Sequence, residues 1–376
     1  MARGENVFYR KDGRFEARYV KGRRADGKLI YGFCYGRNYE EARQKAELER
    51  RKLRESGKGE NTNTISYFCD NWLLMKRTGL KPSSYVKYRS DIKNHIMPYF
   101  GTKYPCEIRS EEVDAFTRVL LEEKGLSPKT VRDILGLFRS IFTYVKKRVQ
   151  EEPRALEIHY PKDRRKTVRV LEEKEEKALL QILAENMDLS KFGIYLALRT
   201  GMRIGEVCAL RWRDISMENE FITVCHTAQR LPRETGHPGE KGDGEGGKTG
   251  LVIGAPKSDS SLRQIPLMPD IAALCKRFLT DSPEHFVLTG TDKCMDPRKL
   301  QRRLKKHLDE CRIEEVHFHT LRHTFATRCV EVGVDVKTLS EILGHSNIGI
   351  TMNQYVHPNL DLKRESLGRL KSVISP

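Results

Sequence analysis

A small set of basic, acidic and phenolic side chains in the second half of the sequence could do chemistry on a phosphate. The set comprises Arg203, Glu206, His319, Arg322, His323, His345 and Tyr355. A pair of guanidinium groups can neutralise a phosphate, histidines can hold or transfer protons, and a tyrosine can become a covalent nucleophile without a metal. The set therefore predicts attack of a phenol on a phosphodiester.

Each member of this set also has an ordinary structural interpretation. A histidine beside apolar residues is more often a satisfied core group than a catalyst, and Arg203 can simply pair with Glu206, three residues away on one helix. Arg322 follows His319 by three residues, so the two side chains share one face of a helix. The order and number of these residues, rather than any single one, favour a catalytic site.

The charge of the chain indicates a polyanionic partner. Its 376 residues include 69 Lys and Arg and 52 Asp and Glu, which gives a formal net charge of +17. A positive field of this size attracts nucleic acid, although basic residues can also be solvated faces with no partner. Residues 1–60 alone hold 17 Lys and Arg against 10 Asp and Glu, and this concentration favours nucleic acid.

Cysteine usage and hydropathy limit the compartment. The nine cysteines are scattered, and the absence of Cys-x-x-Cys spacing is typical of reduced thiols. No run of the sequence approaches the roughly 18 apolar residues of a membrane span, and the first residues form no apolar signal region. We expect a cytoplasmic bacterial protein that associates with the nucleoid and not with a membrane.

Linker-like stretches divide the sequence into predicted domains. The stretch 56–64 is polar and glycine-bearing, and a charged stretch with Pro153 and Pro161 follows the middle region. The resulting boundaries are residues 1–58, 63–156 and 165–376. Helix signals dominate, so the predicted fold class is multidomain and mainly α with small β elements, and the last domain is mixed α+β.

The first domain is predicted to be a three-stranded sheet followed by a helix. The strands are expected at residues 7–10, 14–20 and 29–35, and the helix from about residue 39. The turns between the strands contain Asp-Gly pairs, a strong hairpin signal. In the middle strand Phe15, Ala17 and Tyr19 alternate with charged residues, so these apolar side chains share the face that packs on the helix.

The opposite face of this sheet is basic. The middle strand places Arg14, Glu16 and Arg18 on it, and Arg10 ends the first strand. A narrow sheet can enter the major groove of DNA, so Arg10, Arg14 and Arg18 are candidate DNA contacts. An arginine-rich face turned to solvent is the ordinary alternative.

The middle domain is predicted to be all helical. One helix is expected to end at Pro98 and Gly101, and the clearest helix has Ser127 as N-cap and Pro128 at its first position. One face of that helix carries Val131, Ile134, Leu135, Phe138, Ile141, Phe142 and Val145. The candidate phosphate contacts at its end are Lys146, Lys147 and Arg148. Cations at this position also complement the helix dipole.

Strand-like runs interrupt the helices of the last domain. One run is residues 221–225, and the other is a hairpin in which residues 251–255 pair with residues 262–267 and Lys257 lies in the turn. The glycine-rich insert 234–250 precedes this hairpin. Its Gly-Lys-Thr does not follow a strand at the spacing of a phosphate-binding loop, so no nucleotide site is predicted.

Phrases around the candidate residues resemble the tyrosine recombinase (phage integrase) family. In family order they are residues 200–212, 256–267, 317–327 and 343–357. The resemblance extends to residues 65–150, which are similar to the family's helical core-binding domain. Residues 1–55 resemble, by pattern alone, the sheet-based arm-binding domain of integrases from conjugative transposons and some phages.

The resemblance implies that Tyr355 is the nucleophile and that two arginines hold the phosphate. A phenol has a reference pKa of about 10, so it attacks well only when its proton is removed and the phosphate charge is offset. Arg203 and Arg322 would hold the non-bridging oxygens, a task that suits the guanidinium fork. Negative charge grows on those oxygens during attack, so the arginines stabilise the transition state more than the ground state.

The remaining roles also come from the resemblance. Lys257 would protonate the departing 5′ oxygen, and His319 and His345 would hydrogen-bond the phosphate and assist proton transfer. His323 would support the helix rather than act directly. Glu206 would orient an arginine of the clamp.

The implied reaction is site-specific recombination of a mobile element, by integration and excision. Strands are cut through a 3′-phosphotyrosyl linkage that stores the bond energy, and they are exchanged in a homotetramer through a Holliday junction. No metal or cofactor is expected, and the partners are double-stranded DNA at core and arm sites, with an excisionase or DNA-bending protein as an accessory. The alternatives are a type IB topoisomerase-like relaxing enzyme and a catalytically inactive DNA-binding regulator.

The spacing before the tyrosine departs from the family pattern. Many members place it nine residues after the histidine of Leu-Gly-His, whereas Tyr355 follows His345 by ten. One residue corresponds to about 100° on a helix, so a local loop must absorb the shift. Residues 360–376 then predict a tail helix, which packs on a neighbouring protomer in this family or folds back on its own domain.

Overall fold

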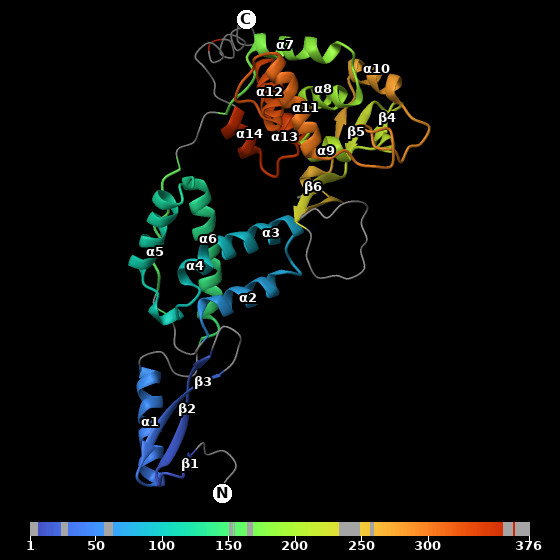
Figure 1. Ribbon diagram of the computed structural model, residues 1–376. Coiled ribbons are helices and arrows are strands. Elements are labelled where there is room, and N and C mark those ends of the chain that lie inside the picture. The colour runs from blue at the N-terminus through green and yellow to red at the C-terminus, as the bar shows by residue number, and fades with distance from the viewer. Residues whose placement is uncertain are drawn as a thin grey trace, which may run out of the picture. The chain divides into compact units, whose positions relative to one another are not determined.

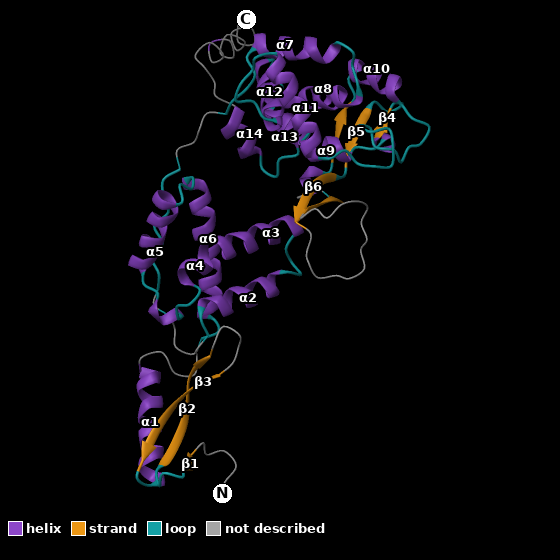
Figure 2. Ribbon diagram, in the orientation of Figure 1, coloured by secondary structure: helices purple, strands orange, loops and turns teal. Residues whose placement is uncertain are grey.

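The computed structural model describes residues 7–23, 29–55, 63–149, 153, 155–163, 168–232, 249–255, 259–355 and 364. As predicted, helices dominate and the sheets are small (Figure 2). The chain forms two compact units, Met1–Arg165 and Lys166–Pro376. Within the described residues no helix has the length and apolar character of a membrane span.

The N-terminal part is a three-stranded antiparallel sheet covered on one face by a helix (Figure 1). Its elements are β1 (Val7–Tyr9), β2 (Phe15–Arg23), β3 (Leu29–Gly36) and α1 (Tyr39–Glu55). Ala17 and Tyr19 of β2 are buried together with Ala42 and Ala46 of α1. The predicted apolar face is therefore confirmed, and the small alanines let the helix approach the sheet closely.

The following residues form a helical bundle with its own core. The helices are α2 (Ile65–Lys76), α3 (Pro82–Asp91), α4 (Met97–Phe100), α5 (Ser110–Arg118) and α6 (Pro128–Lys146). The prediction for α6 is confirmed: the Ser127 Oγ accepts a hydrogen bond of 3.2 Å from the Thr130 N–H. Every apolar residue predicted on the inner face of α6 is buried.

The predicted helix end at Pro98 and Gly101 is confirmed at Gly101, but the chain stays helical through Pro98. A π-helical turn, Ile92–Ile96, joins α3 to α4, and Pro98 lies within α4. A proline inside a continuous helical run removes one N–H of the ladder, and the π-turn just before Pro98 relaxes that ladder where the N–H is missing. The helix instead ends at Gly101, whose N–H donates to the Met97 carbonyl at 2.9 Å.

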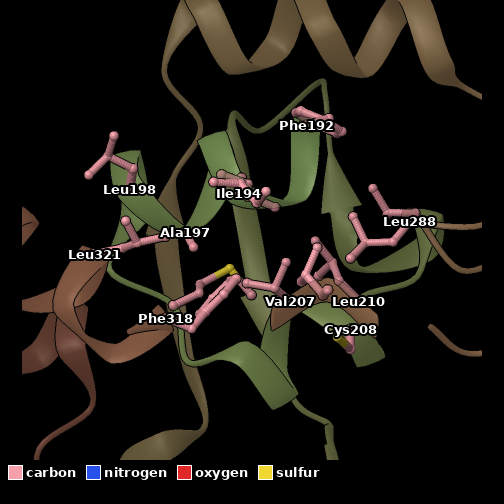
Figure 3. Packing of buried hydrophobic residues seen from close by; sticks show 14 of the residues in the cluster. Phe192, Ile194, Ala197, Leu198, Val207, Cys208, Leu210, Leu288, Phe318 and Leu321 are labelled. Carbon is pink, nitrogen blue, oxygen red and sulfur yellow. The ribbon is translucent and has the colours of Figure 1, made fainter. Parts of the chain in front are cut away.

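The second unit combines a helical core with short strands. Its helices are α7 (Glu173–Ala184), α8 (Leu189–Thr200), α9 (Ile204–Ala209), α10 (Pro269–Phe278), α11 (Pro297–Glu310), α12 (Phe318–Glu331), α13 (Val336–Leu343) and α14 (Ile348–Tyr355). The strands are β4 (Ile215–Ser216), β5 (Phe221–Val224), β6 (Thr227–Pro232), β7 (Thr249–Gly254) and β8 (Arg263–Pro266). Side chains from α8, α9 and α12 meet in the core (Figure 3).

The predicted pairing of residues 251–255 with 262–267 is wrong. β7 pairs with β6, a strand that the sequence analysis missed, and β8 pairs with β5. Burial explains the choice, because Ile265 of β8 and Ile222 of β5 are opposite each other and both buried. The exposed Val252 and Ile253 of β7 offer no comparable core contact. The glycine-rich insert thus connects the strands of the β6–β7 hairpin, and most of it lies outside the described residues.

Candidate active site

Arg322 is the most deeply placed charge of the candidate set. It lies in the first turns of α12 with only 1% of its surface exposed. Its Nη1 donates to the Gly201 carbonyl at 2.8 Å and its Nη2 to the Leu343 carbonyl at 2.7 Å. These carbonyls belong to the C-terminal ends of α8 and α13, where the helix dipoles favour a cation. Burial and then Arg203 lower the pKa of Arg322 to about 9, so it stays charged at neutral pH.

Glycines end both of these helices in left-handed backbone, with φ of +67° at Gly201 and +65° at Gly344. A Cβ at Gly201 would lie 2.6 Å from the Phe325 ring. At Gly344 it would lie 3.0 Å from the Arg263 side chain and from the Ser260 carbonyl. Glycine is therefore needed for conformation and for space, and the freed carbonyls point at the arginine.

Arg203 is anchored by a buried carboxylate. Its Nη1 donates to Glu206 Oε1 at 2.8 Å, and its Nη2 donates to the Gly344 carbonyl at 3.3 Å. The side chain remains 35% exposed, whereas that of Glu206 is 2% exposed. The guanidinium is thus fixed in position while part of it still faces solvent, as a phosphate ligand requires.

Arg263 completes this network and was not predicted from the sequence. Its Nη2 donates to Glu206 Oε2 at 2.8 Å, and its Nε donates to the Ile342 carbonyl at 2.5 Å. Burial alone would raise the pKa of Glu206, but the charges of Arg263 and then Arg203 outweigh burial and hold it below its ordinary value. The signal in the sequence was the position of Arg263 inside one of the family-like phrases.

The structure brings the candidate histidines to the same region. The rings of His319 and His323 meet edge to face with centroids 4.5 Å apart. His345, just after α13, contacts Thr351 Oγ1 through Nδ1 at 2.8 Å. Burial and then the Arg322 charge lower the pKa of His345 to about 4. His319 keeps an exposed edge, yet partial loss of hydration and then Arg322 also lower its pKa.

Tyr355 ends α14 and is buried among these groups, with 6% of its surface exposed. Its hydroxyl lies 2.7 Å from His323 Nδ1, and its ring is parallel to that of His345 within 4°, with centroids 6.4 Å apart. Burial raises its pKa, and the charges of Arg322 and Arg203 oppose that rise. Residues 345–347 form a non-helical connection before α14.

Lys257 lies outside the described residues, so its position relative to this site stays a prediction. Among the described residues, Asp214, Cys225 and His226 form the group with metal-ligand character. The Asp214 carboxylate already accepts hydrogen bonds from the Arg211 N–H at 3.0 Å and the Cys225 thiol at 3.4 Å. These bonds already tie the carboxylate to its own domain.

The predicted DNA contacts of the first domain lie together on the sheet face opposite α1. Glu16 is at their centre: it contacts Arg10 at 2.6 Å and Arg18 at 3.1 Å, and its side chain is only 8% exposed. The Arg18 guanidinium lies over the rings of Phe8 and Phe33 at 4.9 and 5.6 Å. The remaining candidate on this face is Arg14, which pairs with Asp12 at 2.9 Å and lies over the Tyr35 ring.

The predicted contacts of the middle domain lie at the end of α6. Lys146 ends the helix and Lys147 caps it. The Arg148 guanidinium lies 3.7 Å from the centroid of the Tyr144 ring, so it is already partly engaged within the domain.

A model of the phage integrase family matches residues 169–361, more than half of the chain. The chain belongs to this family. A second model, the N-terminal SAM-like domain of phage integrases, matches residues 64–118 of this family member. The protein is accordingly a tyrosine recombinase, as the sequence analysis predicted.

Relatives of this phage integrase family member include recombinases and element integrases. A XerC-like tyrosine recombinase of Caldanaerobacter subterraneus is 28% identical over 95% of each chain. The ICEBs1 integrase of Bacillus subtilis is 24% identical over 89% of each chain.

Solved structures share the fold. The Tn1549 transposon integrase in complex with transposon right end DNA has a TM-score of 0.66 at 22% identity, over 82% of this chain and 99% of that one. A lambda integrase tetramer bound to a Holliday junction has a TM-score of 0.56 at 17% identity, over 96% and 99% of the chains.

Proposed function

We propose that this recombinase integrates and excises a mobile element by cutting DNA with Tyr355. The observation that carries the proposal is the convergence of Tyr355 with Arg203 and Arg322, whose charges both act on the phenol. Both arginines are held by bonds to the scaffold, so they need little reorganisation when charge develops on a phosphate.

The reaction follows from the groups present. The Tyr355 Oη attacks phosphorus, the bond from phosphorus to the 5′ oxygen breaks, and a 3′-phosphotyrosyl linkage forms. Arg203 and Arg322 hold the non-bridging oxygens, His319 and His345 hydrogen-bond the phosphate, and Lys257 delivers a proton to the 5′ oxygen. Attack by a 5′ hydroxyl reverses the step, so religation requires no ATP.

The partners are proposed from the relatives. Related integrases have been seen on transposon end DNA and as a tetramer on a Holliday junction, which supports a homotetramer on core sites. The basic sheet face would bind separate arm sites, and the cations ending α6 would contact core-site phosphates. An excisionase or DNA-bending protein would determine whether integration or excision is favoured. The reaction would take place in the cytoplasm, at the nucleoid.

The test uses suicide substrates made from the ends of the element that carries the gene, nicked so that cleavage traps the covalent complex. The wild-type chain should form an adduct that survives a denaturing gel, with the DNA attached to Tyr355 by peptide mapping. Tyr355→Phe should bind the same DNA without forming the adduct. An adduct in Tyr355→Phe would overturn the proposal, and none in the wild type would favour the inactive regulator.

A second assay separates the recombinase from the topoisomerase alternative. A plasmid carrying a pair of element ends should yield recombined products, and Tyr355→Phe should yield none. Relaxation of supercoiled plasmids that lack these ends, without recombination, would favour a relaxing enzyme.

A further inference from the structure

His323, a residue for which a supporting role was predicted, is in direct contact with the nucleophile, as is Arg322. Its Nδ1 lies 2.7 Å from the Tyr355 hydroxyl and 3.4 Å from Gln354 Nε2. Both partners come from α14, whereas His323 belongs to α12. The contact therefore joins the helix that carries the phosphate-binding arginine to the helix that carries the phenol.

Arg322 also hydrogen-bonds the Tyr355 hydroxyl, and a guanidinium can only donate, so the phenolic oxygen accepts from Arg322. In the tautomer with the ring proton on Nε2, the single lone pair of His323 Nδ1 accepts the phenolic O–H at 2.7 Å. The longer contact of 3.4 Å from Gln354 Nε2 fits the same tautomer, because an amide nitrogen also only donates. The phenolic proton is thus already directed at a base before DNA binds.

The groups around His323 keep it unprotonated and ready to accept. His319 and Arg322 face it from α12, and Tyr355 and Gln354 face it from α14. Burial, then His319 and Arg322, lower its pKa to about 4. A bound phosphate would bring negative charge beside Arg322, which favours a proton on the imidazole when the phenol attacks.

The other histidines are less suited to this task. His345 Nδ1 is engaged with Thr351 Oγ1 at 2.8 Å, and its ring runs parallel to the Tyr355 ring rather than pointing a nitrogen at the hydroxyl. The His319 ring lies against the His323 ring, with the centroids 4.5 Å apart and the rings at 89°. Each is placed to act elsewhere in the site.

We propose that His323 is a catalytic residue, the base that takes the Tyr355 proton during strand cleavage. This inference rests on the proposed function. As the bond from Tyr355 Oη to phosphorus forms, the hydroxyl proton passes to His323 Nδ1, while the bond to the 5′ oxygen breaks and that oxygen takes a proton from the acid. In religation the imidazolium returns its proton to the departing phenolate.

The test measures single-turnover cleavage of the suicide substrate by the full chain with substitutions at position 323. His323→Ala and His323→Gln should bind the DNA normally and cleave about 10²–10⁴-fold more slowly, the usual contribution of a general base. His323→Asn places an amide oxygen near the Nδ1 position, so it can hold the hydroxyl but cannot take the proton. It should be as slow as His323→Ala, and cleavage by His323→Asn at the wild-type rate would overturn the proposal.

A second measurement changes the acidity of the nucleophile. Fluorinated tyrosine incorporated at position 355 has a more acidic phenol and needs its base less. It should speed cleavage by His323→Ala at least tenfold and leave cleavage by the wild type nearly unchanged. If His323→Ala cleaves slowly and fluorotyrosine does not raise its cleavage rate, the proposal is overturned. The role of His323 would then be to hold α12 against α14.

The control is His307→Gln, at a histidine of α11 that bonds Glu310 at 2.9 Å, and its cleavage rate should match the wild type. Thermal unfolding of each variant checks that it is folded. The two proposals fail on different results. If His323→Ala cleaves at the wild-type rate, only the assignment of His323 as the base is wrong. If the wild-type chain itself forms no covalent complex, the proposed function is wrong.

Discussion

Arginines serve both the N-terminal sheet and the catalytic domain, but the two regions hold them in opposite ways. On the sheet the side chains of Arg10, Arg14 and Arg18 are 44%, 59% and 48% exposed. In the catalytic domain the Arg263 side chain is 5% exposed, and Arg322 as a whole 1%. The sheet arginines are held by carboxylates and aromatic faces, whereas Arg322 is held by backbone carbonyls.

The difference fits the role proposed for each region. The Arg14–Asp12 pair is exposed on both sides, and such pairs contribute about 0–1 kcal/mol to stability, so the sheet can exchange this pair for a phosphate with little loss. A buried guanidinium bonded to helix ends cannot move without leaving unpaired carbonyls. The first arrangement suits binding a partner whose position varies, and the second suits stabilising charge at one point in space.

The largest expected effect on stability and cleavage is at Arg322, the buried arginine of the comparison. Arg322→Ala leaves the Gly201 and Leu343 carbonyls buried and unpaired, and we expect unfolding free energy to fall by about 2–5 kcal/mol. Cleavage should fall by about 10³-fold or more. Urea unfolding and single-turnover cleavage measure the two effects.

The matched control lies on the same helix. Arg328 pairs with Glu176 and Glu331 at 2.8 Å each, and its side chain is 33% exposed. Arg328→Ala should leave cleavage unchanged and lower stability less than Arg322→Ala. Equal losses of cleavage would show that any arginine of α12 matters and would remove Arg322 from the clamp.

Arg263→Met should lower cleavage by about 10–100-fold through Arg203, because Glu206 loses its buried partner and no longer fixes the clamp. The pH dependence of stability tests the Arg263–Glu206 pair independently. Glu206 has a folded pKa below its ordinary 4.5, so its stabilising contribution is present above that pH and is lost as pH falls through the folded pKa.

The stability difference between wild type and Arg263→Met should therefore be largest near neutral pH and shrink below about pH 4.5. Denaturant unfolding at a series of pH values measures it. A difference that does not change with pH would mean that Arg263 acts by packing alone.

Gly344→Ala tests whether crowding beside the clamp matters beyond backbone strain. We expect stability to fall by about 1–2 kcal/mol from the left-handed conformation, with an added loss from contact with Arg263 and Ser260. Gly333→Ala is the control, since Gly333 has φ of +83° but nothing within 4 Å of a Cβ. Equal shifts in melting temperature would mean that the close approach at Gly344 costs nothing.

The smallest effects on stability are expected at the sheet. Arg10→Gln, Arg14→Gln and Arg18→Gln should each weaken arm-site binding and lower the slope of log affinity against log salt by about 0.9, with core-site cleavage unchanged. Lys45→Gln removes the same charge from α1, where Lys45 pairs with Glu41 at 2.7 Å, and should change the slope less. If Lys45→Gln lowered the salt slope as much as the sheet variants do, DNA would not bind on the sheet face.

Local pattern predicted most elements of the fold. Helix α6 was predicted with its N-cap and buried face, and the alternation in β2 identified the face that packs on α1. The strand pairing failed, because β6 has weak local signals and its pairing with β7 spans a long insert. Strand pairing over such a distance depends on which residues the core can bury, and no local pattern records that.

For the candidate site, the sequence by itself determined which residues could act: the order of Arg203, His319, Arg322, His345 and Tyr355, and the helices that carry them. The tertiary structure decided how they are held. Arg322 donates to the Gly201 carbonyl, 121 residues away in the sequence, and Arg203 donates to the Gly344 carbonyl, 141 residues away. Arg263 pairs with Glu206, and His323 contacts the Tyr355 hydroxyl. Such contacts join distant segments through the packing of a whole core, so residue types alone do not specify them.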